Sequence, residues 1–192
     1  EIDQLLKEEM HFSNRRQFFS CPAVALQLLN KVEKRSDRLF ELINKVEINM
    51  VNTGPKQEAL FDLLEHLKER EDINRTVLFT HWHPTFFHLK EMLASKFTLF
   101  SVLPDCDDKQ AAEIKDKFAE CDGYSILLVT DRMSEGIDLE MANSMINMDL
   151  PYNPAKLQQR IGRLDRYIQQ SEFIEIHNFA LEDSIEEKQI ET

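Results

Sequence analysis

From residue 76 onward, short apolar segments alternate with segments of helical periodicity, and this alternation is the feature that most restricts the fold. The apolar segments, which we expect to be strands, cover residues 76–80, 97–102, 125–130, 144–148 and 173–177. They show little alternation between apolar and polar residues, which is typical of strands covered on both faces. Strands that alternate with helices predict a parallel sheet with right-handed crossovers. The fold class is therefore α/β.

Helices are expected between these strands. One begins near Pro84, one covers residues 109–119, and one follows Asn153-Pro154, where Asn153 is the expected N-cap and Pro154 the first helical residue. Asp183-Ser184 is expected to open a last helix. The chain before residue 70 shows helical spacing over 23–29, 39–48 and 57–67, with a break at Gly54-Pro55. We expect a helical linker or appendage over residues 1–54, followed by an α/β lobe over residues 55–192.

Charge and composition exclude several classes. The formal charge of −12 argues against a protein that coats nucleic acid non-specifically. Residues 151–170, however, carry four bases against one acid, whereas residues 171–192 carry seven acids against one base. Such a local basic patch suits a defined anionic ligand. Three widely spaced cysteines favour a reducing, cytoplasmic compartment, no apolar run is long enough to span a bilayer, and the missing initiator methionine suggests a piece of a longer protein.

The helix after Asn153 carries two different faces. Helical spacing places Gln159, Gly162, Arg163 and Arg166 on one face and Leu157, Ile161, Leu164 and Ile168 on the other. A glycine inside a helix costs roughly 1 kcal/mol relative to alanine, so its presence suggests that a large anionic group must come close. The alternative is an ordinary solvated surface helix. Ligands of parallel sheets bind beyond the carboxyl ends of the strands, where Thr80, Thr130-Asp131 and Asp149 lie.

None of the four glycines belongs to the phosphate-binding loop of a nucleotide-hydrolysing domain. We therefore expect that this chain does not hydrolyse ATP alone. Two arginines on one face can instead complete such a site from across a cleft, because guanidinium groups bind phosphate oxygens bidentately. An arginine finger of this kind is worth roughly 10³–10⁵ in rate.

Several segments resemble the motifs of superfamily 2 helicases. Residues 126–131 with 134–139 resemble motif V, residues 159–166 resemble motif VI, and residues 76–82 resemble motif IV. Residues 148–154 and 160–166 are most similar to the Swi/Snf-like translocases, among them the bacterial RNA-polymerase-associated ATPases of the RapA or HepA type. The resemblance covers roughly residues 55–192 and implies a RecA-like second lobe, with helices on both faces of its sheet, from a two-lobe, ATP-dependent motor.

The resemblance also implies roles for particular residues. Arg166 is the expected arginine finger and Arg163 its phosphate-contacting companion, which makes this pair the catalytic candidates. Gly136, Asp138 and Gln159 are implied to complete the ATP-binding set, and Thr80, His81, Thr130 and Ser134 to contact the nucleic-acid backbone. The implied cofactor is ATP with Mg²⁺, and the metal is held by the first lobe. The implied partners are that first lobe, nucleic acid (duplex DNA) and RNA polymerase.

Two departures from the family pattern affect details. The family commonly has Arg-Ile-Gly-Gln after motif VI, where this chain has Arg166-Tyr167-Ile168-Gln169, which can change how the helix ends. Arg132 and Met133 stand where the family often has small residues. Two other functions remain open at this point: an RNA helicase lobe of the same superfamily, and a RecA-like module that binds partners without catalysis.

Other candidates are weaker. His81, His83 and His88 lie near one another in sequence, but a zinc site needs about four ligands, so we expect no metal site. Trp82 can stack on a base, although core packing or helix capping is the more common role of such a residue. Asp105, Asp107 and Asp108 are expected to charge a helix N-terminus rather than to act as a catalytic set.

Overall fold

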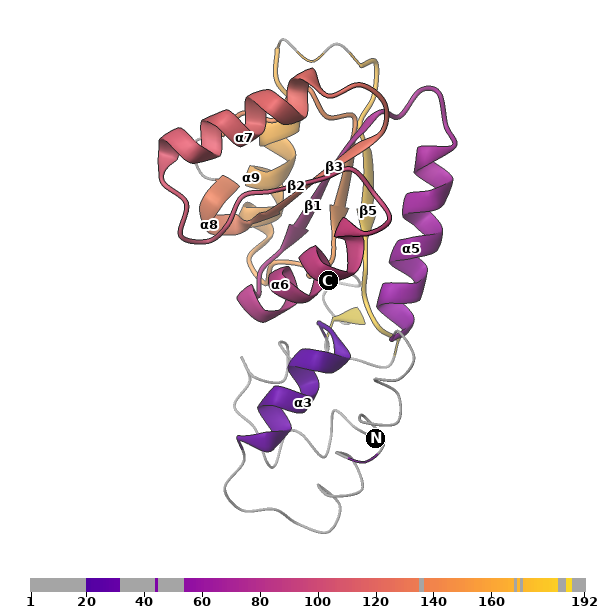
Figure 1. Ribbon diagram of the computed structural model, residues 1–192, viewed down its shortest axis with the longest axis vertical. Coiled ribbons are helices and arrows are strands. Elements are labelled where there is room, and N and C mark those ends of the chain that lie inside the picture. Colours follow the sequence, from indigo (N-terminus) through magenta and orange to yellow (C-terminus); the bar gives the residue numbers. More distant parts are fainter. Residues whose placement is uncertain are drawn as a thin grey trace. The chain divides into compact units, whose positions relative to one another are not determined.

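The computed structural model describes residues 20–31, 44, 54–134, 137–167, 169, 171–182, 186 and 187 (Figure 1). The chain divides into two compact units. The first comprises residues 1–62 and 180–192, and the second comprises residues 63–179. The second unit contains the sheet and all the residues that the sequence predicts as functional. It is described first.

The sheet of the second unit has five parallel strands in the order β2-β3-β1-β4-β5. The strands are β1 (Arg75–Thr80), β2 (Leu99–Ser101), β3 (Ser125–Thr130), β4 (Ser144–Asn147) and β5 (Glu175–Asn178). The registers align the carboxyl ends of neighbouring strands, because Thr80 pairs with Thr130 and Asn147 pairs with Asn178. The predicted parallel α/β sheet is confirmed.

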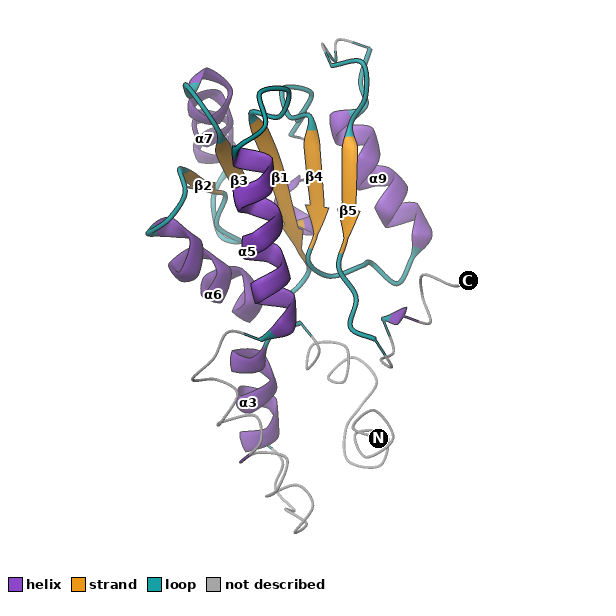
Figure 2. Ribbon diagram, turned by 90° about the vertical axis from the view of Figure 1, so that its right-hand side faces the viewer, coloured by secondary structure: helices purple, strands orange, loops and turns teal. Residues whose placement is uncertain are grey.

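The helices cover both faces of this sheet (Figure 2). They are α6 (His83–Ala94), α7 (Asp108–Glu120), the short α8 (Asp131–Ser134) and α9 (Pro154–Leu164). α6 lies on one face, and α7 and α9 lie on the other. Residues 63–68, the end of α5 (Pro55–Lys68), belong to this unit and lie on the face that α6 covers. Right-handed crossovers explain this distribution, since only the connection from β1 to β2 runs toward the β2 edge.

Apolar side chains alternate between the two faces of the central strands. Val77, Phe79, Leu127 and Val129 join Phe118 and Leu164 in a cluster on the face of α7 and α9. Leu78, Ile126 and Leu128 are also fully buried and point to the other face, together with Phe86, Leu89 and Leu93 of α6. Because both faces are apolar, β1 and β3 read in the sequence as continuous apolar runs.

Both ends of α7 are capped by side chains. Asp107 accepts a hydrogen bond from the backbone N–H of Gln110, and the Gln110 side chain accepts one from the Asp107 backbone, which forms a capping box. The predicted role of this acidic cluster at a helix N-terminus is confirmed. At the other end, the guanidinium of Arg75 donates to the carbonyl oxygens of Phe118, Ala119 and Cys121 at 3.1, 2.6 and 3.1 Å. Arg75 thereby ties the start of β1 to the end of α7.

The first unit contains α3 (Pro22–Asn30), and the first residues of α5 belong to it as well. A buried ion pair joins Lys56 Nζ to Glu186 Oε2 at 2.6 Å, although 130 residues separate the two. Gly54 precedes α5 where a Cβ atom would lie 2.6 Å from Cγ of Pro22, so only glycine fits. The helices expected over 23–29 and 57–67 are present. The helix expected over 39–48, apart from residue 44, and the start of the one expected to open at Asp183-Ser184 fall outside the described residues.

Two strands, β2 and β5, differ from the prediction by more than one residue at an end. β2 covers only Leu99–Ser101 of the expected 97–102, because it is an edge strand that pairs with β3 alone. β5 begins two residues later than expected, at Glu175, where its register with Ser144 of β4 starts. None of the helices in the described ranges is both long and apolar enough to cross a membrane.

Candidate functional site

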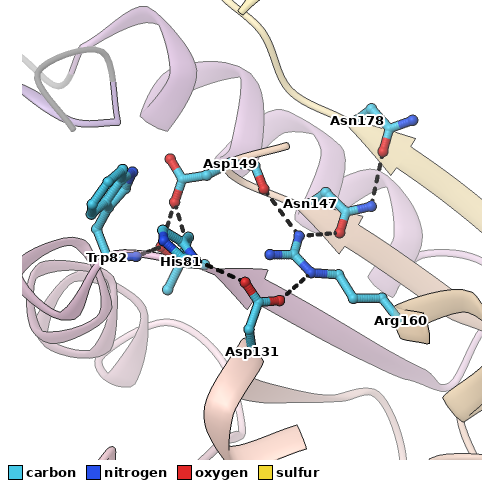
Figure 3. A network of polar contacts seen from close by, with 8 residues as sticks. His81, Trp82, Asp131, Asn147, Asp149, Arg160 and Asn178 are labelled. Carbon is cyan, nitrogen blue, oxygen red and sulfur yellow. Dashed lines mark hydrogen bonds and ion pairs between the residues drawn. The ribbon is translucent and has the colours of Figure 1, made fainter. Parts of the chain in front are cut away.

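Polar side chains gather at the carboxyl ends of β1, β3 and β4. The Thr80 hydroxyl donates to Asp149 Oδ2 at 2.6 Å, and the backbone N–H of His81 donates to the same oxygen at 3.2 Å. His81 Nδ1 lies 2.9 Å from Oδ2 of Asp131 (Figure 3). Thr80, Asp131 and Asp149 thus lie at the carboxyl ends of the strands, where the sequence placed them, and His81 contacts both carboxylates.

Arg160 of α9 lies in the middle of this group. Its Nε donates to Asp131 Oδ1 at 2.6 Å, and its Nη1 donates to Asn147 Oδ1 at 2.6 Å and to the Asp149 carbonyl oxygen at 3.0 Å. The guanidinium also lies over the ring of Phe79, 5.0 Å from its centroid. Only 2% of Arg160 is exposed. Hydrogen bonds from this side chain thus join α9 to the ends of β3 and β4 (Figure 3).

From the sequence, Arg160 was placed in the basic patch and in the segment that resembles motif VI, but its burial was not predicted. One signal was present. Arg160 lies three residues after Leu157 and four residues before Leu164, so helical spacing places it within the apolar stripe. A charged residue inside a buried stripe must have partners, and here the carboxylate of Asp131 is one of them.

The pKa of Asp131 lies well below its usual range. Burial by itself would raise the pKa of this carboxyl, but the hydrogen bonds and positive charges of His81 and Arg160 outweigh burial and lower it. Asp131 is therefore ionised throughout the neutral range and forms a bridge between the buried Arg160 and the half-exposed His81.

The helix α9 begins as predicted and ends earlier. Asn153 caps its N-terminus by accepting a hydrogen bond from the Ala155 N–H at 3.0 Å, and Pro154 is the first helical residue. The helix ends at Leu164 with Asp165 as its C-cap. The side chain of Gln169 donates to the Leu164 carbonyl oxygen at 3.1 Å. The prediction that one helical face carries both arginines was therefore wrong for Arg166. The helix ends two residues before Arg166, where Asp165 is the C-cap and the Gln169 side chain binds the Leu164 carbonyl group.

The two candidate arginines differ in their contacts. Arg163 is half-buried, and its guanidinium has no hydrogen-bond partner among the described residues, while its carbonyl oxygen accepts from the Leu139 N–H at 2.8 Å. Arg166 Nη2 lies 2.6 Å from Asp138 Oδ1 in an ion pair whose side chains are 42% and 50% exposed. Beside Arg163, a Cβ atom on Gly162 would meet nothing within 4 Å. The surface beside Gly162 is therefore open, with Arg163 on α9 and Arg166 two residues beyond the end of this helix.

The remaining predicted residues fall into three groups. Gln159 is exposed on α9. Thr80 and Thr130 are buried, so their hydroxyls face the interior. Ser134 ends α8, and its side chain, like the whole of Gly136, lies outside the described part of the chain.

Trp82 is the N-cap residue of α6, and its ring meets the His81 ring edge-on at a centroid distance of 4.6 Å. The structure thus places Trp82 at a helix terminus.

The histidines near this end of the sheet were also considered as metal ligands. Burial lowers the pKa of His88, which lies on α6. Over the described ranges, no group of three or more histidine, cysteine or acidic residues is arranged to hold a metal ion.

The parallel sheet, the polar strand ends and the arginine-bearing helix define a RecA-like helicase lobe. The chain belongs to the family described as the helicase conserved C-terminal domain, which matches residues 55–167. The expected membership in the helicase C-terminal family is thereby confirmed.

Curated relatives fit this assignment. The chain is 29% identical over 163 residues to the uncharacterized ATP-dependent helicase YqhH of Bacillus subtilis. This match covers 84% of the chain and 28% of that protein. It is 33% identical over 158 residues to the RNA polymerase-associated protein RapA of Vibrio campbellii, and 48% identical over 152 residues to RapA of Sodalis glossinidius. Those two matches cover 82% and 77% of the chain, but only 13% and 15% of the relatives.

A solved structure shows the same fold. The crystal structure of the C-terminal part of the Fun30 ATPase domain superposes with a TM-score of 0.66 at 20% identity, covering 88% of this chain and 52% of that one. The RecA-like fold expected from the sequence is confirmed by this match.

Proposed function

We propose that this chain is the second lobe of a nucleic-acid-stimulated ATPase that moves along duplex DNA. In this proposal Arg163 and Arg166 reach the γ-phosphate of an ATP molecule held by a first RecA-like lobe. That lobe would also supply the phosphate-binding loop and hold the Mg²⁺. The observation that carries the proposal is the open surface beside Gly162 near the end of α9, where Arg163 and Arg166 follow in the chain.

The contacts of the two arginines suit an anionic ligand. A half-buried guanidinium without a described partner, such as that of Arg163, has donors left for phosphate oxygens. The pair between Arg166 and Asp138 is exposed, and exposed pairs are worth only about 0–1 kcal/mol. A triphosphate can therefore replace Asp138 at small cost, and Asp138 is then free for the ribose or phosphates. Gln159 and Gly136 complete the proposed ATP set.

This arrangement assigns separate tasks to the two lobes. ATP binding closes the cleft, the arginines stabilise the charge that develops during phosphoryl transfer, and hydrolysis lets the lobes open and step along the backbone. Taken alone, the lobe lacks the phosphate-binding loop, so we expect weak ATP binding and no turnover.

The proposed nucleic-acid contacts lie at the ends of β1 and β3. His81 is half-exposed there, and Ser134 ends the short helix after β3. Because the hydroxyls of Thr80 and Thr130 are buried, these two threonines would contact phosphates through their backbone. Such contacts hold the backbone without reading its sequence. By analogy with the RapA relatives, RNA polymerase is the proposed protein partner.

The test compares ATP turnover of the full-length protein with that of single variants. Arg166→Ala should lower duplex-stimulated kcat by roughly 10³-fold or more, and Arg163→Ala should also lower it strongly. The matched control is Lys117→Ala, which removes an exposed positive charge from α7, on the same face of the sheet. Near-normal turnover in Arg166→Ala would refute the finger role.

The same assay separates the alternatives. Stimulation by duplex DNA, together with ATP-dependent displacement of the third strand from a DNA triplex, would support a translocase. Stimulation by RNA alone would favour an RNA helicase. The absence of ATPase activity under both conditions would favour a binding module.

A further inference from the structure

We infer that Arg160 is a positioning residue for the arginines of motif VI, and that the Asp131–His81 pair connects this position to the nucleic-acid edge of the lobe. The inference rests on the proposed function and adds a route by which nucleic acid regulates the same site. It concerns three side chains that meet between α9 and the strand ends (Figure 3).

Arg160 fixes where α9 lies on the sheet. Its bonds reach Asn147 at the end of β4, the Asp149 carbonyl group just after β4, and Asp131 just after β3. Arg163 follows one helical turn later. The Leu139 N–H, which donates to the Arg163 carbonyl oxygen, fixes the loop after α8 to the same part of the helix. A shift of Arg160 therefore moves the backbone that carries Arg163.

Three hydrogen bonds attach the Arg160 side chain to the strand ends. Its Nη2 is buried and has no hydrogen-bond partner within the described structure. All of its polar contacts are thus made by Nε and Nη1. When Asp131 moves, Arg160 loses its one charged partner among these contacts.

Asp131 connects the interior to the surface. One of its oxygens accepts from Arg160 and the other lies against the ring nitrogen of His81, so each oxygen serves a different neighbour. The His81 side chain is 38% exposed, whereas that of Arg160 is 2% exposed. The His81 backbone is also held by Asp149, which follows β4. A phosphate group that contacts His81 can therefore change the bond that Asp131 makes to Arg160.

The experiment measures coupling rather than activity alone. In the full-length protein, kcat and KM for ATP are determined with and without duplex DNA for Asp131→Asn and Arg160→Lys. Asp131→Asn keeps the shape of the side chain and removes its charge. Arg160→Lys keeps the charge and removes the planar fork. We expect the ratio of stimulated to unstimulated kcat to fall by about fivefold or more in both variants, with KM for ATP little changed.

The matched control is Asn178→Ala, which removes the 2.8 Å hydrogen bond to Asn147 at the far end of the same group. We expect its stimulation ratio to stay at the wild-type value. Equal losses of stimulated and unstimulated kcat in Asp131→Asn would indicate a merely structural role and overturn the inference, as would an unchanged ratio in both test variants. If Arg160→Lys unfolds below the assay temperature, Asp131→Asn decides alone.

The two proposals fail in different ways. Retained turnover in Arg166→Ala refutes the proposed finger, whatever the variants of Asp131 and Arg160 do. Loss of turnover in Arg166→Ala with normal DNA stimulation in Asp131→Asn and Arg160→Lys leaves the finger in place and refutes only the coupling. If the unaltered protein has no ATPase activity, both proposals are wrong.

Discussion

Asp138 and Arg166 form an ion pair at the surface of the lobe, with Nη2 and Oδ1 2.6 Å apart, whereas Arg160 and Asp131 form a pair of the same length in the interior. The two pairs have the same chemistry and differ in solvent exposure. Exposure decides how much the loss of one partner changes the free energy of unfolding. Water screens the charges of a surface pair, whereas a buried charge that loses its partner is left without water to solvate it.

Stability measurements on matched variants should show this difference. Asp138→Asn should change the free energy of unfolding by less than about 1 kcal/mol. Arg160→Met should lower it by about 3–5 kcal/mol, since it leaves the Asp131 carboxylate without this partner in the interior. Urea unfolding of the two variants and the parent chain under identical conditions tests the prediction. Similar losses in both variants would contradict it.

Gly162 gives a prediction in which stability and activity change in opposite directions. A Cβ atom at this position meets nothing within 4 Å, so Gly162→Ala should raise the free energy of unfolding by about 0.5–1 kcal/mol, the usual gain inside a helix. In the full-length protein the same methyl group should lower ATP turnover, because it occupies space beside the proposed phosphates. Thermal unfolding and an ATPase assay check the two halves. Unchanged turnover would mean that no ligand approaches this glycine.

Tyr124 predicts a loss of stability at alkaline pH. Burial raises the pKa of its phenol to about 12, although the hydrogen bond with Thr76 at 3.0 Å acts in the opposite direction. Between the unfolded pKa of about 10 and the folded value, the unfolded chain releases its proton and the folded chain keeps it, so stability falls as pH rises. The contribution of Tyr124 over this window is about 3 kcal/mol at most.

The measurement compares urea unfolding of the parent chain and Tyr124→Phe at pH 8 and at pH 11. The difference in unfolding free energy between the two chains should shift in favour of the variant at the higher pH. A difference that does not depend on pH would show that the phenol titrates alike in the folded and unfolded states.

Arg75 predicts a local effect on α7. Arg75→Met removes the donors to three carbonyl oxygens at the end of this helix and should lower the free energy of unfolding by about 2–3 kcal/mol. Arg75→Lys should recover part of this loss, because an ammonium group can still donate but lacks the fork. Hydrogen exchange of the last turn of α7 provides the measurement. Equal protection in the parent and in Arg75→Met would be inconsistent with capping by this side chain.

Much of the fold could be predicted because its signals are local. Strand β3 reads as one apolar run, Asn153-Pro154 starts α9, and Asp107 caps α7, and each of these signals lies within a few residues. The parallel order then follows from the alternation of strands and helices. The meeting of Thr80 with Asp149 at the sheet edge could also be expected, since parallel strands end on the same side.

The features that were missed depend on residues far apart in the chain. Burial of Arg160 requires Asp131, Asn147 and the Asp149 carbonyl group, and only one of these is a charged side chain. The ion pair between Lys56 and Glu186 spans 130 residues and leaves no local pattern. The end of α9 was missed although Gln169 lies only five residues after Leu164, because the hydrogen bond from its side chain to the Leu164 carbonyl group follows no periodic pattern. Periodicity describes one segment at a time and carries no information about such contacts.

The position of β1 between β3 and β4 has a consequence for synthesis on the ribosome. The first strand to emerge has both of its neighbours still to come, and β2, the second, pairs only with β3. A nascent chain that ends before Ser125 therefore contains no native strand pair of this sheet. Until β3 leaves the exit tunnel, only helices can form in the second unit, and the apolar residues of β1 stay without their partners.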